Sequence, residues 1–186
     1  MEQYKELADQ IWTTRISRVN AEKRLINKEN FIQAINVYYS CLTIVLSILS
    51  FINKDDKLSL LRIFMTISLL SIILHLNGQK YLDCAQKYKE NYTKLQMLEF
   101  DLKNVMTDDT EAIRKIYKEY CKLLNSSSNH ISYDYYKTVH DSSGEYKEKR
   151  WDNVKKAYSW NIIWRAIVKG VVIVLPILLY VVCEVL

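Results

Sequence analysis

Long apolar runs alternate with polar, charged stretches along this chain of 186 residues. The apolar runs cover residues 34–52, 58–76 and 167–186. Each is close to the ~20 residues that an α-helix needs to cross a hydrocarbon core of roughly 30 Å. The pattern predicts an all-α membrane protein: a transmembrane helical hairpin with long cytosolic helical extensions and a third, C-terminal transmembrane helix.

The apolar runs divide the chain into four consecutive segments of one unit. We expect a cytosolic amphipathic helix at 1–33, the transmembrane hairpin at 34–77, a cytosolic helical bundle at 78–160 and the C-terminal transmembrane helix at 161–186. One Pro and three Gly leave few places where a helix would be interrupted. The second span is the weakest of the three, because Arg62 lies inside it and its guanidinium would have to reach the interface.

Helical spacing of apolar residues continues in the polar segments. The first helix either packs against the other cytosolic helices or lies on anionic lipid with Trp12 at the interface. After the second span, apolar residues recur every seven positions. This repeat predicts that the helix continues unbroken to about Val105 and forms a coiled-coil contact with another helix. The partner helix belongs either to the same chain or to a neighbouring subunit. The seven-residue series is Tyr81, Tyr88, Leu95 and Leu102.

Polar residues at the ends of the later helices indicate where those helices begin. Asp109 or Thr110 can cap a helix that ends near residues 126–129. A short helical turn is expected at 133–139, followed by a loop at 140–144. Ser142 or Ser143 would then cap the helix that leads into the third span.

The distribution of charge predicts the orientation of the chain. Lys and Arg number 26 against 21 Asp and Glu, and the mean hydropathy is −0.13. The basic residues concentrate before the first span, after the second and before the third. Both large polar segments and the N-terminus should therefore be cytoplasmic, with Leu186 outside. Orientation explains the net charge of +5 without nucleic-acid binding, which we do not expect.

The sequence offers little that would support catalysis. It contains no Gly-rich phosphate loop, no H-E-x-x-H, no G-x-S-x-G and no carboxylates at catalytic spacing. The four cysteines include no C-x-x-C pair and are expected to be free thiols. His130 and Asp134 are four residues apart, which suits a hydrogen bond that fixes their loop. We expect no enzyme, no catalytic residue, no metal and no cofactor.

Small polar residues form a stripe on each of the first two spans. The stripes consist of Asn36, Ser40, Thr43, Ser47 and Ser50 on the first span and Ser68, Ser71 and His75 on the second. Such stripes serve either as close-packing and hydrogen-bonding sites between helices or as the lining of a pore. Three helices of one copy cannot enclose a channel, so a pore would require a homo-oligomer.

Short motifs in two segments resemble the SLATT domain family (SMODS and SLOG associating two-transmembrane effector), nearest its fifth subgroup. The first segment is WTTR at 12–15 with NAEKRL at 20–25; the second is YCKLL at 120–124 with the pairs at 129–130 and 134–135. The resemblance gives several of these residues a role in holding the cytosolic bundle or receiving a signal. They are Trp12, Arg15, Glu22, Arg24, Asn129, His130, Asp134 and Tyr135.

The resemblance implies a membrane effector of a bacterial anti-phage conflict system. It would oligomerise in the inner membrane and form a pore or disrupt that membrane, causing growth arrest or cell death. Its trigger would act in trans: a nucleotide-generating enzyme or reverse transcriptase, or the nucleotide product. Apart from the resemblance, the predicted continuity of the helix from the second span to Val105 gives a physical route by which a signal would reach the spans. The alternative is a non-conducting membrane-anchored scaffold that recruits a cytosolic partner and leaves the membrane potential intact.

Overall fold

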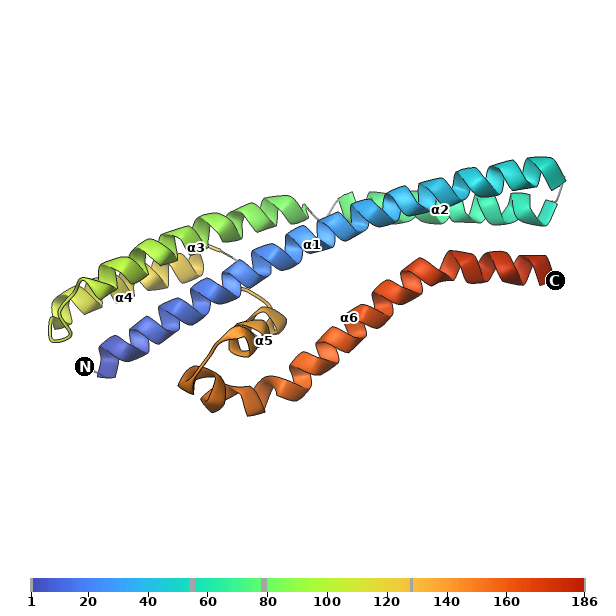
Figure 1. Ribbon diagram of the computed structural model, residues 1–186. Coiled ribbons are helices and arrows are strands. Elements are labelled where there is room, and N and C mark those ends of the chain that lie inside the picture. Colours follow the sequence, from blue (N-terminus) through green and yellow to red (C-terminus); the bar gives the residue numbers. More distant parts are fainter. Residues whose placement is uncertain (1, 54–55, 78–79, 128, 186) are drawn as a thin grey trace. The chain divides into compact units, whose positions relative to one another are not determined.

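The computed structural model describes residues 2–53, 56–77, 80–127 and 129–185. These residues form helices joined by short connections, without a β-strand among them (Figure 1). The helices are α1 (Glu2–Asn53), α2 (Asp56–Asn77), α3 (Tyr81–Lys103), α4 (Thr110–Asn125), α5 (Ser132–Asp141) and α6 (Glu145–Val185). The predicted all-α fold is confirmed.

The helices belong to two compact units. The first unit comprises Met1–Ile26 and Tyr81–Asn161, and the second comprises Asn27–Lys80 and Ile162–Leu186. The long helices α1 and α6 each supply residues to both units.

The second unit carries the candidate membrane spans. Helices α1 and α6 are long and apolar enough to cross a membrane, whereas α2 contributes a shorter apolar stretch, Ser59–Ile72. Many apolar side chains stay exposed, as lipid-facing residues would be; Phe51 is 86% exposed. The two strong candidates are therefore the first and the C-terminal spans predicted from the sequence, and α2 is the weaker third.

Apolar contacts and tyrosine hydrogen bonds hold the helices of the second unit together. Its core joins Ile35, Tyr39 and Leu46 of α1 to Leu61 and Met65 of α2. The hydroxyl groups of Tyr38 and Tyr39 donate to the carbonyl oxygens of Ile173 and Val172 in α6, at 2.9 and 2.8 Å. The C-terminal helix thus packs against the α1 segment of this unit.

The first unit packs α1 against α3 and α4. Its main apolar core takes residues from all three helices: Leu7 and Ile11 from α1, Leu95, Leu98 and Leu102 from α3, and Ile113, Ile116 and Tyr120 from α4. Leu95 and Leu102 belong to the predicted seven-residue series, and Leu98 lies between them. The coiled-coil-like contact of α3 therefore lies within this chain.

The predicted unbroken helix from the second span to Val105 is wrong. Helix α2 ends at Asn77 and α3 begins at Tyr81. Lys80 has φ +46°, in the left-handed region, which does not continue a right-handed helix. The sequence holds a signal for this break, since Asn followed by Gly commonly ends a helix; Gly78 itself lies outside the described residues.

Capping explains where α4 begins. The side chain of Asp109 accepts a hydrogen bond from the backbone N–H of Ala112, at 3.0 Å. This bond satisfies one of the free N–H groups of the first turn. Of the two predicted caps, Asp109 is the one used.

The connection between α5 and α6 differs from the prediction. Helix α5 continues to Asp141 and so includes His140, which we expected in the loop. The backbone N–H of Ser142 donates to the carbonyl of Thr138 at 3.1 Å, so Ser142 ends α5 instead of beginning α6. The first bonds of α6 go to the carbonyl of Gly144, whose φ of +64° suits glycine.

Candidate functional site

A layer of buried polar side chains crosses the first unit between α1, α3, α4 and α5. Seven of its side chains are almost fully buried: Thr14, Ser17, Arg18 and Asn20 of α1, Asn91 of α3, and Asp134 and Thr138 of α5. We call this set the polar layer. A buried polar group is destabilising unless it is hydrogen-bonded. The four helices are therefore stable only in an arrangement that brings these polar groups within hydrogen-bonding distance of their partners.

Arg18 lies at the centre of the polar layer with no exposed surface. Its guanidinium donates to Oδ1 of Asn91 and to the carbonyl oxygens of Leu123 and Leu124, the last two at 3.1 and 3.4 Å. These carbonyls belong to the last turn of α4, where helix carbonyls lack partners and the helix dipole is negative. The positively charged Arg18 side chain therefore caps the C-terminus of α4.

Burial determines the electrostatics of Arg18. It lowers the pKa of the guanidinium, and the neighbouring Tyr120 and Tyr88 partly oppose this shift. An arginine still remains charged at neutral pH. The buried Nε of Arg18 has no hydrogen-bond partner among the described residues. The helical bundle therefore encloses a permanent positive charge whose hydrogen-bond donors are not all paired.

Asn91 connects α3 to the same end of α4. Its Nδ2 donates to the carbonyl of Leu123 at 2.9 Å and to Oγ of Ser126 at 3.0 Å. Together with the bond from Arg18, these contacts satisfy both the oxygen and the nitrogen of the amide. The end of α4 is consequently held from α1 and from α3.

Arg24 forms an ion pair with Asp134 of the polar layer. Nε and Nη2 of Arg24 donate to the two carboxylate oxygens of Asp134 at 2.8 and 3.1 Å, and the Asp134 side chain has no exposed surface. Oδ2 of Asp134 also accepts from the N–H of Ile131 at 3.2 Å, at the start of α5. The paired geometry fixes α5 against α1.

Hydroxyl and amide groups complete the contact between α1 and α5. Oγ1 of Thr138 accepts from Nδ2 of Asn20 at 3.0 Å and shares a hydrogen bond with the hydroxyl of Ser17, also at 3.0 Å. Thr138 in turn donates to the carbonyl of Asp134, one helical turn earlier. Ser17, Asn20 and Arg24, which follow one another by three and four residues along α1, therefore all contact α5.

His130 borders the polar layer. Its Nδ1 is buried and has no hydrogen-bond partner among the described residues, and Asp134 bonds to Arg24 and Ile131 instead. The hydrogen bond expected between His130 and Asp134 is therefore not made through Nδ1. Burial lowers the pKa of His130; the charge of Arg18 adds to this shift, and that of Asp134 opposes it. The neighbouring Asn129 accepts from the hydroxyl of Tyr88 at 3.0 Å through its carbonyl.

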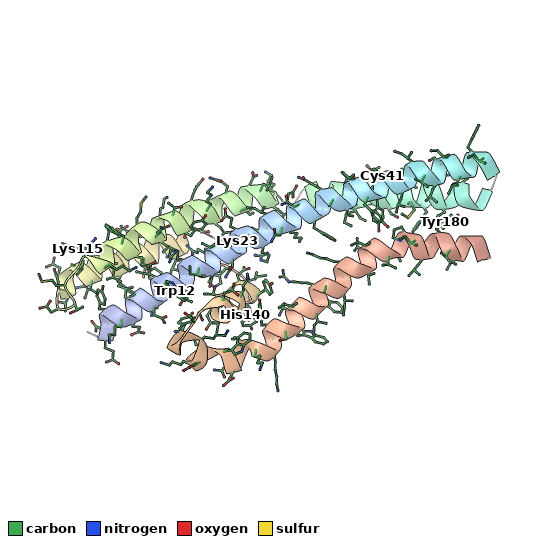
Figure 2. All side chains as sticks on the ribbon, viewed as in Figure 1. Trp12, Lys23, Cys41, Lys115, His140 and Tyr180 are labelled. Carbon is green, nitrogen blue, oxygen red and sulfur yellow. The ribbon has the colours of Figure 1, made fainter. Side chains whose placement is uncertain are left out.

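The other candidates from the sequence make separate contacts in the first unit. Trp12 of α1, which Figure 2 labels, is half-buried and meets the ring of Tyr146 edge to face with ring centroids 4.8 Å apart. Arg15 pairs with Glu99 at 2.7 Å. Burial, together with a hydrogen bond to the Glu22 carboxylate, raises the pKa of Tyr92. The ring of Tyr135 lies 6.1 Å from that of Tyr136.

Sequence reasoning missed Arg18, Asn91 and Thr138, although the first two follow a readable pattern. Buried residues of α1 recur with steps of four and three at 7, 11, 14, 18, 21 and 25. Arg18 falls on this core register, and Asn91 falls on the matching register of α3 between Tyr88 and Leu95. A polar residue at a core position of a heptad-like pattern indicates a buried interaction.

The polar stripes of the spans are placed within the second unit. Asn36 and Ser68 are half-buried, and Ser40 and Ser71 are exposed. The hydroxyls of Thr43, Ser47 and Ser71 donate to carbonyls four residues earlier in their own helices. Ser50 bonds to Ser59 of α2 at 2.5 Å. The side chain of His75 lies outside the described residues.

Neither thiols nor metal ligands form a centre in the described part of the chain. Cys41, Cys84 and Cys121 are free. No group of three or more His, Cys, Asp or Glu side chains there is placed to hold a metal ion.

These features define an all-helical membrane protein in which a polar-cored helical unit shares two long helices with the candidate spans. The chain matches the SMODS and SLOG-associating 2TM effector domain family 5 over residues 1–182, and it belongs to this family. The resemblance drawn from the short motifs is therefore confirmed. By its description, the family consists of effector domains with two transmembrane segments. No curated protein and no solved structure matches the chain significantly.

Proposed function

We propose that the chain is the membrane effector of a bacterial anti-phage conflict system. It resides in the inner membrane and, once triggered, permeabilises that membrane as a homo-oligomer, which stops growth or kills the infected cell. The single observation that carries this proposal is the match to the effector family over nearly the whole chain, including both strong candidate spans.

Physical features of the spans support the oligomer. Helices α1 and α6 expose apolar side chains along the candidate spans, so they can contact lipid or further copies. Ser40 and Ser71 are exposed, while Asn36 is half-buried. Polar side chains on an otherwise apolar surface favour association with other polar groups inside a membrane. Several copies that brought these residues around one axis would create a polar conduit.

The first unit is the receiving part in this proposal. It would lie in the cytoplasm with the N-terminus, and the C-terminus would be outside. The trigger is a sensor acting in trans, a nucleotide-generating enzyme or reverse transcriptase, or its nucleotide product. The polar layer suits the reception of a signal because its hydrogen bonds form together in one arrangement of the helices. A change at one partner therefore affects the others. The two helices shared between the units, α1 and α6, offer the route to the spans.

Membrane potential in expressing cells tests the proposal. Induction of the full chain should depolarise cells, as read by a potential-sensitive dye, before they stop growing. Replacing the α1 stripe residues Asn36, Ser40, Thr43, Ser47 and Ser50 with Leu should strongly reduce depolarisation at equal membrane abundance. The matched control places Leu at exposed apolar positions of the same helix, Val37, Ile44, Val45, Ile48 and Phe51, and should leave depolarisation unchanged.

The non-conducting scaffold is the outcome that contradicts permeation. In that case, induced or infected cells would keep their membrane potential while a cytosolic partner co-purified with the membrane fraction. Retained potential at full membrane abundance, in cells infected with a phage that the system restricts, would therefore refute the proposal.

A further inference from the structure

The charged residues of α6 are all basic in the segment where its sequence changes from polar to apolar. Asp152 is the last acidic residue before Glu184, and the residues between them include Lys155, Lys156, Arg165 and Lys169. The apolar stretch of α6 that qualifies as a membrane span follows in the same helix. A basic segment directly beside a span is the charge pattern that anionic lipid attracts.

Along one face of α6, the side chains change from charged through aromatic to aliphatic, as a lipid monolayer changes from headgroup to hydrocarbon. In the first unit, α6 packs through Val154 and Tyr158, which are each 7% exposed. Lys149, Asp152 and Lys156 lie on the opposite face by helical spacing and are exposed, so two ammonium groups and one carboxylate occupy this part of the face. Trp160 is 67% exposed and follows Lys156 after one turn.

The same face continues from indole to aliphatic side chains. Trp164, one turn after Trp160, is 58% exposed, and Ile163 and Ile167 are each 51% exposed. The sequence along the helix is thus ammonium, indole, aliphatic. This is the order of polar, interfacial and hydrocarbon regions from the surface of a bilayer towards its centre.

We propose that this face binds an anionic phospholipid. We define it as the α6 collar: Lys149, Lys156, Trp160 and Trp164. The lysine ammonium groups would pair with the headgroup phosphate, the indole N–H groups would donate to phosphate or ester oxygens, and an acyl chain would lie along Ile163 and Ile167. Charge complementarity and continuity with the candidate span favour lipid over a protein partner. The proposal rests on α6 entering the membrane and not on permeation.

Lipid quenching of tryptophan fluorescence tests the collar in the full chain. Trp12→Phe and Trp151→Phe leave Trp160 and Trp164 as the only indoles, since the chain has four Trp. Both replaced side chains make ring contacts that phenylalanine can retain. The protein is reconstituted in phosphatidylcholine vesicles that contain brominated phosphatidylglycerol or brominated phosphatidylcholine. Bromine quenches indole on contact, so the two titrations give the relative association of each lipid with the collar.

We expect brominated phosphatidylglycerol to associate roughly threefold to tenfold better than brominated phosphatidylcholine, and added salt to reduce this ratio. Lys149→Gln with Lys156→Gln should bring the ratio close to one. Lys115→Gln with Lys118→Gln on α4 removes the same charge elsewhere and should leave the ratio unchanged.

Three results would overturn the proposal. Equal quenching by both lipids in the parent protein would show no selectivity. A ratio that survives the loss of Lys149 and Lys156, or falls equally in the α4 control, would show that the collar lysines are not responsible. Absence of quenching by either lipid would show that the indoles do not meet the membrane. None of these readouts depends on depolarisation, so the proposed function can fail or stand separately.

Discussion

Arg18 is held by the carbonyl oxygens of Leu123 and Leu124 and by the Asn91 amide. A positive charge therefore stabilises the negative end of α4 from inside the bundle. Its loss would remove the Arg18 donor from the Asn91 amide oxygen and the Leu124 carbonyl, while the Leu123 carbonyl would keep its bond from Asn91. Removing a donor from a buried acceptor is costlier than losing an exposed hydrogen bond.

Arg18→Ala should accordingly lower the free energy of unfolding by about 2–4 kcal/mol. Thermal unfolding of the full chain in detergent, followed by circular dichroism, measures the change. Arg114→Ala serves as the control, because Arg114 is an exposed arginine of α4 and its loss should change stability by no more than about 0.5 kcal/mol. Equal effects of the two substitutions would contradict the role given to Arg18.

His130 makes the stability of the first unit depend on pH. Its folded-state pKa lies below the ordinary value, mainly because of burial, so folding favours the neutral ring. The stabilisation is complete above the unfolded pKa of about 6.5 and is lost as pH falls from there through the folded pKa. Acidification from pH 7.5 to 5.5 should therefore lower the melting temperature.

The contribution of His130 is separated from other titrating groups by substitution. His130→Gln should reduce the drop in melting temperature between pH 7.5 and 5.5, because glutamine does not gain a proton. His140→Gln is the matched control, since His140 is the other described histidine of the first unit and bonds to Asp141 at its surface. An unaltered pH dependence in His130→Gln would argue against a buried neutral ring.

At the scale of elements, the break between α2 and α3 depends on the backbone at Lys80. A side chain in the left-handed region is strained, while glycine adopts it freely. Lys80→Gly should thus stabilise the protein by up to about 1 kcal/mol, and Lys80→Val, with a β-branched side chain, should destabilise it by a similar amount or more. Unfolding in detergent tests both. The opposite order of stabilities would mean that this residue does not keep the conformation with φ +46°.

Periodicity predicted the helices well where one register continues. The spacing of Tyr88, Leu95 and Leu102 identified the buried face of α3, and Asp109 identified the start of α4. The break after α2 was missed because apolar spacing continues on both sides of Asn77, so only the local Asn-Gly signal marked it. Patterns report which face is buried; they do not report backbone conformation at a single residue.

The candidate site could be predicted only in part. Arg24 and Asp134 were both singled out, yet their pairing joins residues separated by 110 positions, and no local spacing indicates such a contact. Arg18 was overlooked because the basic residues before the first span were interpreted only as determinants of orientation. Arg18 lies on the core register of α1, so its position in the repeat predicts its burial better than its residue type does.

For the whole molecule, α1 and α6 are the helices that the two units share. The separation of α2 from α3 removes the route to the spans that the sequence had indicated. If the polar layer keeps the effector inactive, loosening it should act on the spans through a shared helix. This consequence can be tested without knowledge of the natural trigger.

Arg18→Ala should increase depolarisation of expressing cells at equal membrane abundance, because the polar layer loses its central donor. Two glycines inserted after Ile26, where α1 passes from the first unit to the second, interrupt the helix and rotate its register. The insertion should suppress the increase caused by Arg18→Ala while the protein still enters the membrane. The same insertion after Asp108, in the connection before α4, is the control and should preserve the increase. An increase that persists despite the insertion in α1 would exclude this helix as the route, leaving α6 as the remaining shared helix.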